Sequence, residues 1–265
     1  MITRTVSATD GITLHVEEVG NGQPVVFVQG LGYAAWAWRS QRDAVDRVAR
    51  AVVMDNRGAG RSDKPPAPYS IEQMADDVAS VIESCGGPAM VVDASMGGYI
   101  AMTLAVRRPE LVAALGLVST LTGGPDSFGV PEETRAVWAA NMGRAPQEFA
   151  RATMPLSLAP GWVEEHPERF EELLTARLEH PTPPEAWQAQ WDACSRFLVD
   201  GVPPGPIDQP TWVVHGTLDR VVPVENAAAI QRRIPHATVT VLPGAGHLCW
   251  LEQPDEVNAL ILDAL

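Results

Sequence analysis

Apolar residues gather along the chain in short runs that are rich in β-branched side chains: Val25–Val28, Ala51–Met54, Met90–Val92, Ala114–Val118, Thr211–Val214 and Val239–Leu242. Runs of this length and composition are typical of strands buried on both faces of a parallel sheet. Segments with the apolar spacing of a helix lie between them: Trp36–Val48, Ile71–Ile82, Ser95–Val106, Val224–Ile234 and Pro254–Leu265. Because strands and helices alternate, the pattern predicts the α/β class, with a doubly wound and mostly parallel sheet.

The alternation stops between residues 121 and 206, where no buried-strand run occurs and proline and tryptophan become frequent. Four amphipathic helices are predicted there: Glu132–Met142, Gln147–Met154, Glu164–His180 and Glu185–Val199. We therefore expect residues 1–120 and 207–265 to form the core and residues 121–206 to form a helical lid over the carboxyl edge of the sheet. A side lobe without a role at the site is the alternative.

Composition narrows the possible classes of protein. The 265 residues include 19 basic and 33 acidic ones, for a formal net charge of −14, so no concentrated basic face for binding nucleic acid is expected. The most apolar long stretch, residues 89–106, is interrupted by Asp93 and by Gly97-Gly98, which fits a strand and a helix better than a membrane span. The first residues do not resemble a secretory signal. We expect a soluble chain without a membrane partner; its oligomeric state stays open.

Three cysteines, Cys85, Cys194 and Cys249, are too few and too scattered for a disulfide framework or a zinc cluster. A sparse, odd set suits a reducing cytoplasm. A domain of this size buries enough surface to fold without disulfides or metal. We expect a cytoplasmic protein with no metal and no cofactor.

Ser95 lies where the predicted strand Met90–Val92 turns sharply into a helix, in the run Asp93-Ala94-Ser95-Met96-Gly97-Gly98. A serine on such a turn projects beyond the sheet, and the next N–H and the helix dipole face any negative charge that forms beside it. This pattern indicates a nucleophile. A serine that merely caps the helix is the simpler alternative.

Two further residues complete a catalytic arrangement. His247 follows the last predicted strand, and Asp219 follows the strand Thr211–Val214. The carboxyl ends of parallel strands meet at one edge, so His247 could take the Ser95 proton while Asp219 orients the imidazole. The chain order Ser, Asp, His is the one expected of this arrangement. We predict that His247 Nε2 lies within hydrogen-bond reach of the Ser95 hydroxyl and that Nδ1 faces Asp219.

These segments, together with Gln29-Gly30-Leu31-Gly32 and the turn from Asp55 to Ser62, resemble the α/β-hydrolase superfamily over almost the whole chain outside the lid. The resemblance implies an eight-stranded, mostly parallel sheet and no cofactor. It implies an oxyanion hole formed by the N–H groups of Leu31 and Met96. It also implies a structural role for the Asp55–Ser62 turn. The lid-bearing branch with enol-lactonases, carboxylesterases and haloperoxidase-like hydrolases is the most similar.

The chain departs from the family pattern at two positions. Asp93 stands where the elbow usually has glycine, and Gln29 stands where the loop usually begins with histidine. A buried carboxylate needs a partner, so we predict that Gln29 donates to Asp93; the alternative is that the two side chains never meet. Because Ser95 occupies the apex that epoxide hydrolases and haloalkane dehalogenases fill with a carboxylate, both of those activities are excluded.

Aromatic and sulfur side chains suggest a pocket for a bulky, hydrophobic small molecule. The candidates for substrate contact are Trp36, Trp138, Met142, Trp162, Trp187 and Trp191. The same tryptophans could simply pack the lid onto the core.

The sequence therefore predicts a serine hydrolase that cleaves an ester, lactone or thioester of a hydrophobic carboxylic acid through an acyl-enzyme. Two alternatives stay open. One is a lyase, cyclase or cofactor-free oxygenase of the same fold that uses His247 as a base. The other is a ligand-binding protein with a vestigial triad.

Overall fold

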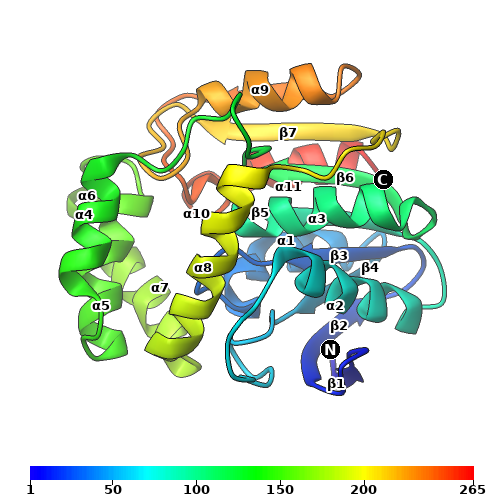
Figure 1. Ribbon diagram of the computed structural model, residues 1–265, viewed down its shortest axis with the longest axis horizontal. Helices are drawn as coiled ribbons and strands as arrows, with labels where there is room; N and C mark the ends of the chain where they lie inside the picture. The colour runs from blue at the N-terminus through cyan, green and yellow to red at the C-terminus, as the bar shows by residue number, and fades with distance from the viewer.

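The computed structural model describes residues 1–265 and contains one eight-stranded sheet (Figure 1). The spatial order is β1-β2-β4-β3-β5-β6-β7-β8. β1 and β2 pair antiparallel, as do β2 and β4, and every other pair is parallel. The strands are β1 (Ile2–Ser7), β2 (Thr13–Gly20), β3 (Pro24–Val28), β4 (Arg50–Met54), β5 (Ala89–Ala94), β6 (Val112–Val118), β7 (Thr211–Gly216) and β8 (Thr238–Leu242). The predicted fold class and mostly parallel sheet are confirmed.

Helices cover both faces of this sheet. One face packs against α2 (Ile71–Ser84), α3 (Met96–Arg107) and α9 (Glu225–Arg233), where 42 buried residues form one core cluster. The other packs against α1 (Arg39–Val45), α10 (Cys249–Glu252) and α11 (Pro254–Asp263), with a second cluster of 30. The sheet is therefore doubly wound. The predicted helix 36–48 is shorter than expected, since it consists of a 3₁₀ turn, η1 (Ala35–Trp38), followed by α1.

Only helices occur between β6 and β7, apart from connecting loops. We call residues 121–206 the helical insert. It contains α4 (Glu132–Asn141), α5 (Pro146–Thr153), η3 (Met154–Ser157), α6 (Trp162–Glu165), α7 (Pro167–Glu179) and α8 (Pro184–Asp200). In Figure 1, α4 to α7 lie to the left of the sheet, and α8 runs between them and the sheet. The predicted single helix 164–180 is divided, because Pro167 has no N–H and begins a new helix.

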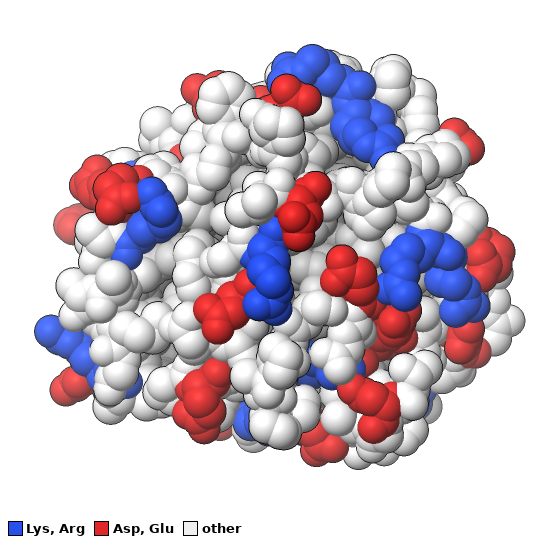
Figure 2. All heavy atoms as spheres, viewed as in Figure 1, with Lys and Arg blue, Asp and Glu red and all other residues white.

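No helix in the structure has both the length and the apolar character that crossing a membrane requires. On the face seen in Figure 2, basic and acidic side chains are interspersed, and the basic ones gather only in small groups. This distribution matches the acidic balance of the sequence.

Candidate active site

Ser95 occupies the turn between β5 and α3 with φ 54° and ψ −116°, a conformation that costs a non-glycine residue about 1–3 kcal/mol. The turn is held by neighbours: the Ser95 N–H donates to the Val118 carbonyl at 3.0 Å, and the Thr120 hydroxyl donates to the Ser95 carbonyl at 2.7 Å. The turn is possible only because Gly97 and Gly98 have no side chains. A Cβ on Gly97 would lie 2.6 Å from the Val28 carbonyl oxygen, and one on Gly98 would lie 2.2 Å from Thr120 Oγ1.

His247 and Asp219 form a hydrogen-bonded pair, with 2.8 Å between His247 Nδ1 and Asp219 Oδ2. The other carboxylate oxygen, Oδ1, accepts from the N–H groups of Val221 and Val222, each at 2.8 Å. The Asp219 side chain is fully buried. Burial acts to raise the pKa of Asp219, but the charge of His247 and hydrogen bonds from His215 and His247 lower it to about 2. Asp219 is therefore an anion across the neutral pH range.

His215 is a partner of this pair that the sequence did not reveal. Its ring is buried, with Nε2 2.8 Å from the Val222 carbonyl oxygen and 3.2 Å from Asp219 Oδ2. His215 belongs to β7 and Asp219 lies four residues further along, on the loop after that strand, so this short spacing was the available signal.

Ser95 and His247 line the same cavity, but the structure contains no hydrogen bond between the Ser95 hydroxyl and His247 Nε2. The predicted contact between Nδ1 and Asp219 is present, whereas the predicted hydrogen bond of Nε2 is not formed in this structure. Leu31 and Met96 line the cavity beside Ser95, and neither N–H donates to another group of the protein. The site thus brings together a hydroxyl, an oriented imidazole and two free N–H donors.

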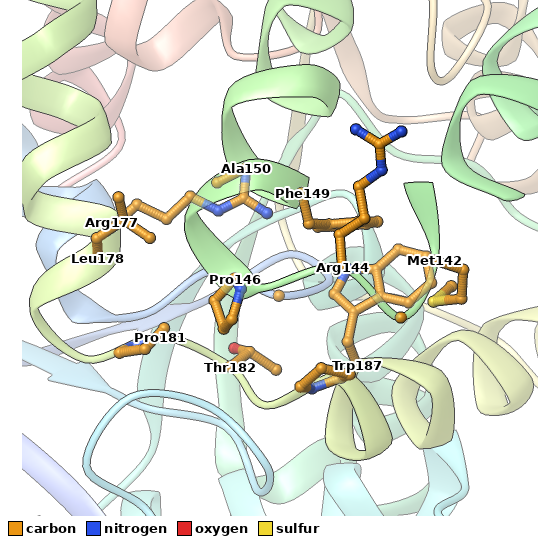
Figure 3. A pocket seen from close by; sticks show the side chains of 13 residues that line it. Met142, Arg144, Pro146, Phe149, Ala150, Arg177, Leu178, Pro181, Thr182 and Trp187 are labelled. Carbon is orange, nitrogen blue, oxygen red and sulfur yellow. The ribbon is translucent and has the colours of Figure 1, made fainter. Parts of the chain in front are cut away.

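The cavity encloses about 660 Å³, part of it open to solvent, and most of its wall is apolar. Of the predicted substrate contacts, Trp138, Trp187 and Trp191 line it. Met142 lines an adjoining outer pocket between α5, α7 and α8 (Figure 3). Trp36 and Trp162 do not reach either space: Trp36 packs against Tyr33, and Trp162 packs against His166.

Residues that the sequence did not single out complete the wall. Trp250 and Phe149 add aromatic surface, and Tyr33, Ser157 and Arg177 bring polar groups to it. Arg177 lies on the apolar side of α7, at helical spacing from Phe170, Leu173 and Leu174. A basic residue within an apolar helix face was the sequence signal that could have identified Arg177.

The predicted hydrogen bond from Gln29 to Asp93 is wrong. Both side chains are fully buried, and none of their four polar atoms has a hydrogen-bond partner. Val28 is the register partner of Asp93, so Gln29, one residue further along, is expected on the opposite side of the sheet. Burial raises the pKa of Asp93 well above its usual range, which keeps the carboxyl neutral.

A family model described as alpha/beta hydrolase fold matches residues 23–254. The chain belongs to this family. It is 26% identical over 273 aligned positions to a 2-hydroxy-6-oxo-2,4-heptadienoate hydrolase of Pseudomonas putida, covering 96% of this chain and 93% of the relative.

Solved structures agree. A thermophilic esterase from Thermogutta terrifontis, with malate bound, superposes with a TM-score of 0.82 at 29% identity, covering 99% of this chain and 97% of the esterase. Est816, described as an N-acyl homoserine lactone degrading enzyme, gives a TM-score of 0.79 at 28% identity, covering 99% and 100%. Family and relatives together support hydrolase chemistry.

Proposed function

We propose that this chain is a serine hydrolase that cleaves esters, lactones or thioesters of a hydrophobic carboxylic acid through an acyl-enzyme. The observation that carries the proposal is the strained Ser95 turn facing one cavity with the His247–Asp219 pair and the free N–H groups of Leu31 and Met96. A serine that merely caps a helix does not require this strained backbone conformation. It is explained when the hydroxyl must stand clear of the sheet.

Each group has a defined task in this mechanism. Neutral His247 accepts the Ser95 proton as the oxygen attacks the substrate carbonyl, and Asp219 stabilises the imidazolium that forms. The N–H groups of Leu31 and Met96 bind the oxyanion of the tetrahedral intermediate, each worth about 3–4 kcal/mol in comparable sites. His247 then protonates the leaving oxygen or sulfur, which departs and leaves the acyl-enzyme. Water deprotonated by His247 releases the acid and restores Ser95.

Arg177 refines the substrate class. The residue is only 9% exposed and lines both the cavity and the outer pocket, yet it forms no salt bridge with a carboxylate of the protein. Its contacts are the Tyr33 ring, 4.6 Å from the guanidinium carbon, and the Tyr33 hydroxyl at 3.4 Å. Buried cations are normally paired, so the partner of Arg177 is a carboxylate on the substrate.

The relatives support a carboxylate-bearing substrate. The Pseudomonas putida enzyme acts on a heptadienoate, which is a carboxylate, and the Thermogutta terrifontis esterase was solved with malate, a dicarboxylate. In Figure 3 the Arg177 side chain extends from α7 toward α5, into the outer pocket. The acyl chain would then lie among the tryptophans, with its far end at Arg177 and the helical insert as a lid.

The three cysteines are unpaired, which is consistent with the proposed cytoplasmic location.

Two matched p-nitrophenyl esters test this class: the hexanoate, which is neutral, and the monoester of adipic acid, which ends in a carboxylate. We expect Arg177→Gln to lower kcat/KM for the adipate ester by about 10- to 100-fold and to change the hexanoate by less than about threefold. Arg169→Gln, at an exposed arginine of the same helix α7 that lines neither space, is the matched control and should leave the ratio between the two esters unchanged. An equal loss on both esters would contradict a carboxylate at Arg177.

Ser95→Ala separates the alternatives. Full turnover of a native substrate by this variant would favour a lyase, cyclase or oxygenase that uses His247 as base. A wild-type chain that binds hydrophobic acids but neither hydrolyses esters nor reacts at Ser95 would be a ligand-binding protein.

A further inference from the structure

Glu252, the last residue of α10, joins two parts of the molecule that meet at the site. Its Oε1 accepts from the N–H of Gly246, directly before His247, at 3.0 Å. Its Oε2 accepts from the N–H of Ala159, in the helical insert, at 3.1 Å. One carboxylate therefore connects the His247 loop to the insert.

The backbones are in close contact around this link. A Cβ on Gly246 would lie 2.5 Å from the Ala159 nitrogen and 2.6 Å from the Leu158 carbonyl carbon. The N–H of Leu248, directly after His247, donates to the Ser157 carbonyl at 2.8 Å. The residue before His247 is therefore bonded to Glu252, and the residue after it is bonded to the 155–159 segment of the insert.

The loop that carries Asp219 is tied to the same segment. Arg220 Nη2 donates to the carbonyl oxygens of Pro155 at 2.7 Å and Leu158 at 3.1 Å. Both partners in the His247–Asp219 pair therefore depend on where this segment lies. A small shift of it would alter the position of the imidazole relative to Ser95.

Only an ionised carboxylate offers two strong acceptors at this place. A neutral acid keeps one carbonyl oxygen and one weak hydroxyl acceptor, and a glutamine amide presents a donor to one of the two N–H groups. Protonation of Glu252 therefore weakens one half of the link while the side chain keeps its size.

The charges around Glu252 are few. Asp219 and Arg220 face it from the loop after β7, the buried Cys249 thiol lies on the same helix α10, and His247 lies on the loop that Glu252 binds. The 155–159 segment has no titratable side chain. Burial raises the pKa of Glu252 to about 7, with a contribution from Asp219, against the lowering effect of Ala159 and Gly246 N–H and of Arg220. Glu252 thus changes charge within the physiological pH range.

We propose that Glu252 is a positioning residue whose ionised carboxylate holds the His247 loop against the helical insert, and that hydrolysis requires this link. The inference rests on the proposed function for its catalytic part. The link itself is independent of the reaction.

The acid side of the pH profile tests the catalytic part. If hydrolysis needs both a neutral His247 and an ionised Glu252, log(kcat/KM) for p-nitrophenyl hexanoate rises with a slope approaching 2 at low pH in the wild type. In Glu252→Gln the slope is 1, and kcat at pH 8 falls about 10- to 100-fold. Glu256→Gln, an exposed glutamate on α11, is the matched control and keeps the wild-type profile.

Amide hydrogen exchange tests the link without any reaction. At pH 8 we expect the peptides that contain Ala159 and Gly246 to exchange faster in Glu252→Gln than in the wild type or in Glu256→Gln. Thermal unfolding of each variant shows that the compared chains are folded.

Each failure has its own signature. A wild-type slope of 1, or Glu252→Gln with wild-type kcat, overturns the positioning role. Unchanged exchange at both peptides overturns the link. A wild type that does not hydrolyse esters removes the proposed function and with it the catalytic part, while the exchange result still decides whether Glu252 makes the link.

Discussion

Ser95 keeps its positive φ because groups from other elements fix the residue on both sides. The Val118 carbonyl and the Thr120 hydroxyl at the end of β6 bond its backbone, and Gly97 and Gly98 let α3 approach β3 and the loop after β6. The Ser95 turn could be predicted because such turns require small residues at fixed positions relative to the serine. The His215 contact with Asp219 could not, because it depends on how the loop after β7 folds back.

Asp219 is the residue whose loss should affect the chemistry most selectively. Asp219→Asn keeps the size of the side chain but removes the charge that stabilises the His247 imidazolium. We expect kcat for an activated ester to fall by about 10³- to 10⁴-fold with a folded protein. Asp208→Asn, on the surface, is the control. Wild-type kcat in Asp219→Asn, measured by steady-state kinetics, would remove Asp219 from the mechanism.

Asp93 should affect stability rather than catalysis. Its pKa is raised in the folded state, so the folded chain retains a proton that the unfolded chain releases, and this contribution to stability is present at low pH and lost as pH rises. Asp93→Asn removes the titration. We expect its Tm to exceed that of the wild type by about 2–4 °C or more at pH 8, with a smaller difference at pH 4.

The same variant tests whether Asp93 opposes the oxyanion. A neutral Asp93 carries no charge to do so, and Asp93→Asn should hydrolyse p-nitrophenyl hexanoate within about threefold of the wild-type rate. A Tm difference that does not change with pH would show that the folded state does not hold this proton.

At the scale of elements, helix α8 fixes the loop that precedes α1. Gln190 is fully buried; its Oε1 accepts from the Gly32 N–H at 3.0 Å, and its Nε2 donates to the Arg57 carbonyl at 2.8 Å. Gly32 adjoins Leu31, whose N–H is a proposed oxyanion donor. The helical insert thus supports the site from a side that the sequence pattern did not indicate, because a buried glutamine in an amphipathic helix is not distinguishable from a surface one.

Gln190→Met should separate transition-state binding from substrate binding. The change keeps the volume but leaves the Gly32 N–H and the Arg57 carbonyl without partners, at a cost of about 1–3 kcal/mol of stability each at most. We expect kcat to fall about tenfold or more with little change in KM, measured by steady-state kinetics on p-nitrophenyl hexanoate. Gln188→Met, on the same helix with its amide on Asp192, should behave like the wild type. A change in KM alone would mean that Gln190 shapes the pocket rather than the oxyanion donors.

Whether a segment is a strand or a helix could be predicted where one hydrophobic period dominates its sequence. β3, β5 and β7 read as continuous apolar runs because both faces of the sheet are covered. β1 escaped prediction because it is an edge strand with mostly exposed residues. The division between α6 and α7 was missed because it depends on one residue, Pro167, within an otherwise helical pattern.

At the scale of the whole molecule, the sheet and the helical insert contribute different parts of the candidate site. The core supplies Ser95, Asp219 and His247 at the carboxyl ends of its strands. The insert supplies most of the aromatic wall together with Arg177. The core chemistry was predictable because strand ends in a parallel sheet share one edge, whereas the pocket depends on how the helices of the insert pack across that edge.

Reaction of the folded chain with a fluorophosphonate, followed by intact mass and peptide mapping, tests whether Ser95 is a nucleophile, since only an activated serine reacts. We expect one label per wild-type chain, on the peptide that contains Ser95, none in Ser95→Ala, and loss of ester hydrolysis in step with labelling. A wild-type chain that stays unlabelled while folded, or a Ser95→Ala variant that retains hydrolysis, would contradict this role of Ser95.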